Sequence, residues 1–518
     1  MSRSLRASKP ESQPNYLLFS DVHLGADLVQ HARPWTIGRL RRVLQIDREL
    51  SSMLDHYREQ AEPGRPWKLV IAGDLVDFVG MSIAPATGQE LETPLTEEER
   101  SHGLGSARDH ALYKMRAAAS RHDLVFRKLA DFVAAGHSLV LVRGNHDVDF
   151  YWETARDAFV QALVDRAGDA LAEPSERQAF QARVEFRQWF YYVEDLLYVE
   201  HGHQYDETCA HPHWLAPISP RDPRRIAYSF SDILMRYIVR PTRGLSTEGH
   251  DDKNILYYLR LAFSMGIGGA ARLGFRYGHA VAAMFAEWRD HVSERAREVR
   301  AEHERHMHEI GERFRVSAEQ LRELYALSAT PVNTRPFRIL STLFVDLAAT
   351  AALSALTLLV LLLAGVPLAY LGPIAGAIFV GLVIWHRSAR VFDPPSALKR
   401  GAAHIARLFP TRFVVMGHTH APTMEPIDNG ATYVNLGGWA VDDLDVELPG
   451  EAEHDARPHD APCTHLVIRH VDGQPRAELR RWNSRTGIKL LHASDAMAQG
   501  DGDSGVRALP ENPEERVA

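Results

Sequence analysis

The chain alternates short apolar runs with longer amphipathic stretches. Apolar runs at 16–19, 68–72, 139–142, 196–199 and 412–416 each end abruptly in polar residues rich in Gly, Asp, Asn and His. Such runs predict buried strands. Helical patterns at about 37–57, 107–135 and 152–190 lie between the first four. Strands that alternate with helices predict a layered α/β domain whose functional residues gather at the carboxyl ends of strands.

After residue 416 the pattern becomes that of β-structure. Strands are predicted at 432–436, 464–470 and 476–482, and Asp472-Gly473 predicts a hairpin turn between the last two. A single α/β domain is therefore expected in two parts, 16–211 and 400–490. The polar segments 1–15, 442–460 and 491–518 are expected to be disordered.

The stretch 212–399 separates two of the predicted strand ends and is interpreted as a helical insertion. It opens with an Arg-rich aromatic segment, 224–240, which suits either a helix lying on lipid headgroups or an ordinary packed amphipathic helix. A highly charged helical run follows at about 287–327. Its histidines are expected on the surface without a function: His291, His303, His306 and His308.

An uncharged run occupies residues 347–385 and is divided at Gly365-Val366-Pro367. Each half, 347–364 and 368–385, has 18 residues. A helix of that length spans roughly 27 Å, near the thickness of the hydrocarbon layer of a membrane. We therefore expect a transmembrane hairpin; the alternative is a buried hydrophobic hairpin in a soluble core.

The flanks of this run set its expected orientation. Arg335 and Arg338 precede it, Arg387 and Arg390 follow it, and the turn has no charge. Because positive residues stay on the cytoplasmic side, both flanks are expected there. The expected location is the cell inner membrane, with the α/β domain in the cytoplasm.

Composition narrows the classes of partner. Of the 518 residues 45% are hydrophobic and 24% are charged, and the formal net charge is -8, so the chain folds and has no overall bias toward nucleic acid. No nucleic-acid partner is expected. Cys209 and Cys463 are expected to be buried thiols rather than a disulfide framework. The first 15 residues lack the apolar segment of a secretory signal.

All five predicted strand ends carry groups that bind metals. The motifs are Asp21-Val22-His23, Gly73-Asp74-Leu75-Val76-Asp77, Gly144-Asn145-His146-Asp147, His201-Gly202-His203 and Gly417-His418-Thr419-His420. Glycine lets the backbone turn tightly beside such ligands. Mixed oxygen and imidazole ligands suit Mn²⁺, Fe²⁺ or Zn²⁺ rather than Ca²⁺, and the lack of thiolates disfavours a structural zinc site.

This ordered set of motifs resembles that of the calcineurin-like metallophosphoesterase superfamily. The resemblance implies a four-layer α-β-β-α sandwich with two divalent metals, Mn²⁺ first among the candidates, at the strand ends. It assigns one metal to Asp21, His23 and His420 and the other to Asn145, His201 and His418. Asp74 would bridge the two metals.

The resemblance also suggests roles for residues beside the ligands. His146 would face the substrate, stabilising the transition state or protonating the leaving oxygen, with Asp77 as its carboxylate partner. A turn or helix-cap acid is an equal alternative for Asp77. Two roles remain open for His203: it could support the ligands from behind, or it could contact the substrate. Asp147 is expected to hydrogen-bond within its loop.

Two divalent ions about 3.5–4 Å apart can convert a bridging water to hydroxide and neutralise the charge that develops on a phosphoryl group.

Segments 20–25, 144–147 and 433–439 are closest in form to the UDP-2,3-diacylglucosamine pyrophosphatases, which hydrolyse a lipid-bearing diphosphate. Trp439, in the last of these segments, is expected in the core rather than in a substrate pocket.

The expected function is therefore hydrolysis of phosphate ester or diphosphate bonds, with a lipid-linked substrate at the cytoplasmic membrane face. One alternative is a phosphatase or phosphodiesterase for soluble nucleotides or phosphoproteins. Another is a non-catalytic scaffold with the same fold. The presence of all seven ligands and of His146 argues against the scaffold.

Overall fold

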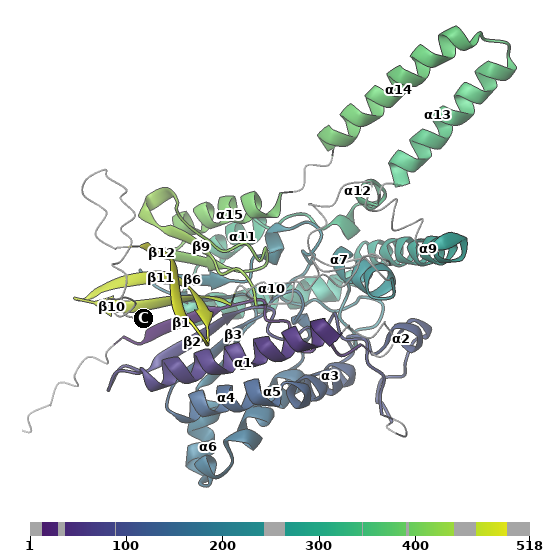
Figure 1. The fold of residues 1–518 in the computed structure, drawn as a ribbon. Coiled ribbons are helices and arrows are strands. Elements are labelled where there is room, and N and C mark those ends of the chain that lie inside the picture. The colour runs from purple at the N-terminus through teal and green to yellow at the C-terminus, as the bar shows by residue number, and fades with distance from the viewer. Residues whose placement is uncertain are drawn as a thin grey trace, which may run out of the picture.

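The computed structural model describes residues 13–29, 37–86, 88, 90–242, 265–343, 345–389, 393–439 and 463–494. Two β-sheets form its centre (Figure 1). The seven-stranded sheet comprises, in spatial order, β12 (Gly487–Ser494), β11 (Gln474–Asn483), β10 (Thr464–Val471), β1 (Asn15–Phe19), β2 (Trp67–Ala72), β3 (Ser138–Val142) and β4 (Val184–Arg187). The five-stranded sheet comprises β5 (Phe190–Val193), β6 (Leu197–Glu200), β7 (Phe413–Met416), β9 (Thr432–Asn435) and β8 (Thr423–Pro426).

The sheets pack face to face because side chains alternate along each strand. In β1, Leu17 and Phe19 pack on the outer helices, whereas Tyr16 and Leu18 pack against the second sheet. The outer face of the first sheet is covered by α1 (Ile37–Glu59), α3 (Arg108–Arg121), α4 (Asp123–Ala134) and α5 (Glu153–Ala167). The outer face of the second is covered by α11 (Ala318–Ala326) and α15 (Pro394–Leu408). The layers are thus α-β-β-α.

All eight strands expected from the pattern are present, with ends shifted by up to two residues. The helical pattern at 107–135 is two helices, α3 and α4, which meet at His122. The helical prediction for 152–190 was wrong at its C-terminal end, because α6 (Pro174–Gln181) is followed by the short strands β4 and β5. The segment 491–518 was expected to be disordered, but β12 reaches residue 494; residues 1–12, 440–462 and 495–518 lie outside the described residues.

Strands β6 and β7 are parallel neighbours, pairing Leu197 with Phe413, so the chain between them leaves and re-enters one sheet. That chain includes α7 (Phe230–Leu234), the π-helix η4 (Met235–Val239), α9 (Gly266–His291), α10 (Ala296–Phe314) and α12 (Pro336–Thr342). Of these, α7, η4, α9 and α12 share a core of their own in which Phe230, Ile233 and Met284 are buried, whereas α10 packs against the core on the second sheet. The charged run at 287–327 is therefore divided among α9, α10 and α11.

Most of the Arg-rich segment 224–240 packs inside the protein, and only its first residue, Arg224, is exposed. Arg236 is 4% exposed, and its guanidinium donates to Glu98 of α2 (Glu97–His102) and to the carbonyls of Gly103 and Leu104. The packed-helix interpretation of this segment is therefore right, and the headgroup interpretation is wrong. The surface expectation also fails for His303, which is 4% exposed and whose Nδ1 accepts from the Leu215 amide at 3.2 Å.

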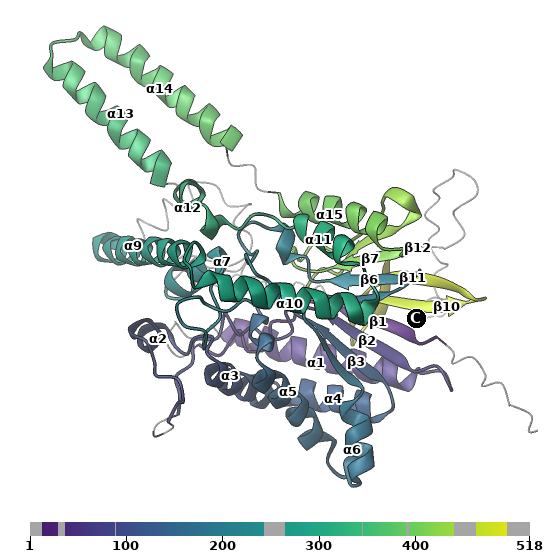
Figure 2. The same cartoon turned by 180° about the vertical axis from the view of Figure 1, so that it is seen from behind.

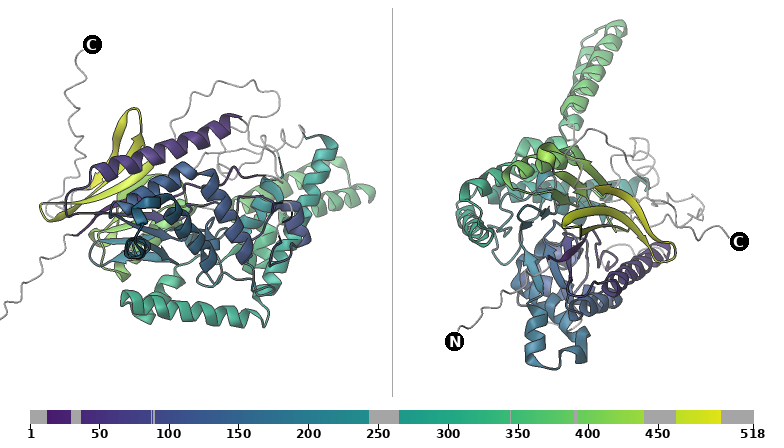
Figure 3. Two further views of the ribbon diagram at one scale, coloured as in Figure 1. Left: turned by 90° about the horizontal axis from the view of Figure 1, so that it is seen from below. Right: turned by 90° about the vertical axis from the view of Figure 1, so that its left-hand side faces the viewer.

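The uncharged run forms two antiparallel helices, α13 (Val345–Leu363) and α14 (Leu368–Ala389), which project away from the rest of the protein (Figures 1 and 2). The same projection is plain in the right-hand view of Figure 3. Apolar side chains on both helices are exposed, including Leu353 (64%), Leu363 (78%) and Phe379 (68%). The alternative of a hairpin buried in a soluble core is therefore wrong.

Within the described residues, no helix combines the length and the apolarity that crossing a membrane requires. The transmembrane hairpin expected at 347–385 is thus not supported. The turn at 364–367 divides the run between two helices, α13 also contains Asp346, and α14 contains Pro373. The side chains at 345–348 and 385–389 lie outside the described residues.

Candidate metal centre

The seven residues expected as metal ligands come together where five strands end. Asp21 and His23 follow β1, Asp74 follows β2, Asn145 follows β3, His201 follows β6, and His418 and His420 follow β7. Because β1, β2 and β3 run parallel, as do β6 and β7, their carboxyl ends lie at one edge of the sandwich. The sequence motifs therefore form one site although they span most of the chain.

The backbone at this site is strained. Five of the seven residues have left-handed φ angles of 54–71°, a region that is costly for residues with a Cβ: Asp21, His23, Asp74, His418 and His420. Such conformations persist only where the surrounding structure imposes them, and they cluster at functional sites. The strain turns neighbouring side chains toward a common centre.

Glycines beside the ligands allow this close approach. A Cβ on Gly73, whose φ is +88°, would lie 2.5 Å from Nδ1 of His201. A Cβ on Gly144 would lie 2.1 Å from Oδ1 of Asp74. Neither position accepts a larger residue without displacing a ligand.

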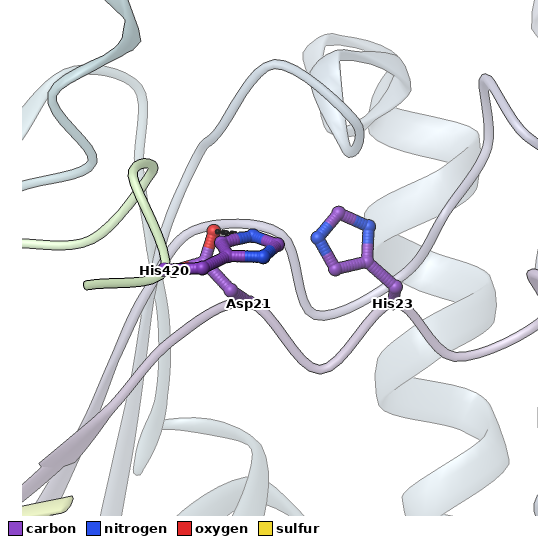
Figure 4. A group of neighbouring side chains, drawn as sticks. All are labelled: Asp21, His23 and His420. Atoms are coloured by element: carbon purple, nitrogen blue, oxygen red, sulfur yellow. Dashed lines mark hydrogen bonds and ion pairs between the residues drawn. The ribbon is translucent and has the colours of Figure 1, made fainter. Parts of the chain in front are cut away.

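One group of candidate ligands consists of Asp21, His23 and His420, whose ligand atoms all lie within 4.8 Å of one another. Figure 4 shows the His420 ring beside the Asp21 carboxylate, joined to it by the dashed line, with His23 facing the pair from the same loop as Asp21. Nε2 of His420 is 3.2 Å from Oδ1 of Asp21. Burial alone would raise the pKa of Asp21, but His420 holds it below its usual value. This is the set expected for the first metal.

A second group links Asp21 to Asp74 and His201. Nε2 of His201 lies 3.1 Å from Oδ2 of Asp74 and 3.0 Å from Oδ1 of Asn145. Asp74 also lies 4.0 Å from Nε2 of His23, so it sits between the two groups. That is the place expected of a bridging ligand.

His418 completes the set with a partner that the sequence had not indicated. Its ring is 5.4 Å from that of His201 between centroids, and its Nε2 is 3.0 Å from Oδ2 of Asp206. Asp206, Cys209 and His418 form another group that could hold a metal. Asp206 follows the short 3-10 helix His203–Tyr205. It stands apart from the strand-end motifs, so spacing gave no signal for it.

His146 and Asp77 lie beside the candidate ligands and contact each other. Nδ1 of His146 is 2.7 Å from Oδ1 of Asp77, and its side chain is 20% exposed whereas that of Asp77 is 2% exposed. Burial lowers the pKa of His146, but the carboxylates of Asp77 and Asp74 outweigh it and raise the pKa to about 9. His146 thus carries a proton at neutral pH on an imidazole that a substrate can reach.

Arg240 fixes the other side of Asp77. It follows η4 in the insertion, and its Nη2 donates to Oδ2 of Asp77 at 2.9 Å while its Nη1 donates to the Ala26 carbonyl. Because Asp77 also accepts from the Gly80 amide, it is held from three directions. The sequence left the segment with Arg240 between a headgroup helix and a packed amphipathic helix and gave no partner for this residue, so its role was missed. A turn acid and a partner of His146 were alternatives for Asp77; the side chain is both.

The remaining motif residues support the loops. Asp147 accepts from the amides of Gly144 and Leu75, as expected for a loop acid. His203 is 2% exposed and packs on Trp214, with 4.1 Å between ring centroids, which places it behind the ligands. Trp439 is buried in the core, also as expected, and donates to the Thr464 carbonyl.

These residues fit divalent metals. Asp21 and Asp74 are at most 2% exposed, and within the described residues no Lys or Arg forms an ion pair with either. Nε2 of His23 is buried without a hydrogen-bond partner. Burial lowers the pKa of His201, yet Asp74 raises it to about 9, so a proton on this imidazole pairs with the Asp74 carboxylate. Metals displace such protons when they bind.

Comparison with known proteins agrees with this chemistry. The family model described as calcineurin-like phosphoesterase matches residues 14–245. The match includes Asp21, His23, Asp74, Asn145 and His201 and ends before His418. Among curated proteins, a search found no match.

Proposed function

The chain contains a calcineurin-like phosphoesterase domain and is a metal-dependent phosphoesterase, and we propose that it hydrolyses phosphate ester or diphosphate bonds of a lipid-linked substrate. The observation that carries the proposal is the convergence of seven ligand side chains beside a protonated, reachable His146. In this proposal Asp21, His23 and His420 hold one divalent metal, and Asn145, His201 and His418 hold the other. Asp74 belongs to both.

Two divalent metals would supply Lewis acidity to the phosphoryl group and a water of lowered pKa. Residues of the chain would donate the proton and hold the proton donor in place. The imidazole of His146, held at Nδ1 by Asp77, presents its Nε2 side to the leaving oxygen and can donate a proton there. Arg240 keeps Asp77 charged and in place, because the guanidinium and His146 together hold the pKa of this buried carboxylate below its usual value.

Chelation tests the metal requirement. Treating the full chain with a chelator should abolish hydrolysis of bis(p-nitrophenyl) phosphate, and Mn²⁺ should restore it. The restored protein should contain two metals per chain by elemental analysis. Hydrolysis that persists in metal-free protein would refute the proposed mechanism. Fe²⁺ and Zn²⁺ added separately identify which metals support turnover.

The proposed lipid link rests on the hairpin α13–α14. The hairpin has no charged side chain from 347 to 385 and projects away from the rest of the protein, and an exposed apolar helix face of this kind is suited to lipid. Leu353, Leu356, Leu359, Leu362 and Leu363 are all at least 45% exposed and spread over about half the circumference of α13. Burying each such side chain is worth about 1.5–3 kcal/mol. We therefore assign the hairpin to a lipid phase. The Arg residues that flank it suggest that the rest of the protein lies on the cytoplasmic side of that membrane.

Vesicle flotation tests this assignment. The full chain should float with vesicles of phosphatidylethanolamine and phosphatidylglycerol, and deletion of 347–385 should leave it unbound. The double substitution Leu356→Glu with Phe379→Glu should act in the same direction. Leu124→Glu is the matched control, because Leu124 is an exposed leucine (41%) on α4, away from the hairpin.

The deletion also separates a lipid-linked substrate from a soluble one. If the substrate is in the membrane, the deletion should lower kcat/KM for a lipid diphosphate in vesicles while leaving hydrolysis of bis(p-nitrophenyl) phosphate unchanged. A panel of nucleotides and phosphopeptides completes the comparison. Faster turnover of a nucleotide or phosphopeptide than of any lipid diphosphate would contradict the lipid-linked proposal.

A further inference from the structure

A cavity of about 350 Å³ lies between the insertion and the catalytic domain. Helix α10 of the insertion forms one wall, and β4 with residues 188–190 forms the other. Figure 2 shows α10 extending along the domain on this side. The cavity is lined by aromatic rings, including Trp189 and Phe314, and by four arginines: Arg143, Arg156, Arg187 and Arg313.

Arg143 is the most informative of these residues. It is 4% exposed, and its Nε and Nη1 are buried without a hydrogen-bond partner. Its Nη2 donates to the Trp214 carbonyl, and its guanidinium lies 4.2 Å from the centroid of the Trp214 ring. Across the described parts of the chain, no carboxylate forms an ion pair with it. A buried charge without a counter-ion is costly, so an anion is the partner that the site lacks.

The other charged residues around the cavity also favour an anion as its ligand. Glu309 is the only acid among the described residues that line it. Arg187 is paired with Glu185, but its Nε is buried and unpartnered. Arg156 donates only to the carbonyls of Phe150 and Tyr151 within the described structure. Guanidinium groups bind phosphate oxygens through paired hydrogen bonds, and aromatic walls can pack against a ring.

We propose that this cavity binds a phosphomonoester whose phosphate meets Arg143 and Arg313 and whose ring or apolar part packs on Trp189 and Phe314. The site is separate from the metal centre. Trp214 lies between the two, in contact with Arg143 on one side and with His203 on the other. The proposal goes beyond the hydrolytic function and does not depend on turnover, because the arginines that form the site bind no metal.

Titration of the full chain tests the site, with inorganic phosphate and adenosine monophosphate as probes. Binding is followed by calorimetry and by tryptophan fluorescence, once with Mn²⁺ and once with a chelator. Chelation should remove binding at the metal centre and leave one binding event in the cavity. Adenosine monophosphate should bind more tightly than inorganic phosphate, because only the nucleotide has a ring to pack on the aromatic wall.

Substitutions then test whether the binding event that persists after chelation takes place in the cavity. Arg143→Gln and Arg313→Gln should each weaken it about tenfold, as expected for loss of one charge-assisted contact. Arg313 is exposed, so its variant should fold even if the Arg143 variant does not. The matched control is Arg297→Gln, also on α10, whose side chain is 71% exposed and pairs with Glu294. Unchanged affinity in Arg313→Gln, or no binding after chelation, would overturn the proposal.

Discussion

Replacing Asp74 with Asn is expected to lower kcat/KM for bis(p-nitrophenyl) phosphate in Mn²⁺ by at least about 10³-fold, or ~4 kcal/mol. Asp74 lies between the two groups of candidate ligands, 3.1 Å from His201 and 4.0 Å from His23. Asparagine keeps its shape and can accept the His146 amide as Oδ1 now does at 2.8 Å. Only the negative charge is removed, so metal content should fall together with activity.

The control for this substitution has a matching backbone. Asp195 has φ 58°, close to the 56° of Asp74, but it lies exposed in the turn between β5 and β6. Asp195→Asn should leave both metal content and kcat/KM unchanged. An Asp74→Asn protein that retains two metals and full activity would show that Asp74 does not bridge.

Substitution of His146 with Ala is expected to lower kcat by about 10²–10⁴-fold while both metals stay bound. The ring is 20% exposed and binds Asp77, whereas the neighbouring Asn145 contacts His201. Elemental analysis and kinetics on the same sample separate the two effects. Loss of metal in His146→Ala would mean that this residue is a ligand.

The pH profile distinguishes a proton donor from a residue that only shapes the loop. The pKa of His146 is raised to about 9, so the proton is present below that pH and is lost as the pH rises through it. Activity should therefore decline as the pH rises through this value, which gives the pH profile a basic limb. Asp77→Asn removes the carboxylate that raises this pKa and should move the limb to lower pH. A limb that does not move would assign Asp77 to the loop alone.

The sequence predicted the candidate ligands because each one lies in a short motif directly after a strand. Parallel strands bring their carboxyl ends together, so Asp21, Asp74 and Asn145 meet without any knowledge of distant packing. The alternation of strands and helices predicted a layered α/β domain, whereas the four-layer arrangement was implied by the family resemblance. Local pattern and long-range structure agree at these positions.

Residues supplied by the insertion could not be predicted in this way. Arg240 reaches Asp77, and Trp214 packs on Arg143, only because of how the insertion packs on the domain. The strands β4 and β5 have four residues each and follow a helical pattern without a clear break, so periodicity did not reveal them. The exposure of α13 and α14 also depends on how these helices pack rather than on their composition.

The position of β7 has a consequence for the order of events during synthesis. β7 lies between β6 and β9, and it carries His418 and His420 on the loop that follows it. A ribosome makes the chain from its N-terminus, so α13 and α14 are complete before β7 exists. Under the proposed function, the hairpin can therefore reach lipid before His418 and His420, the two proposed ligands that follow β7, have been made.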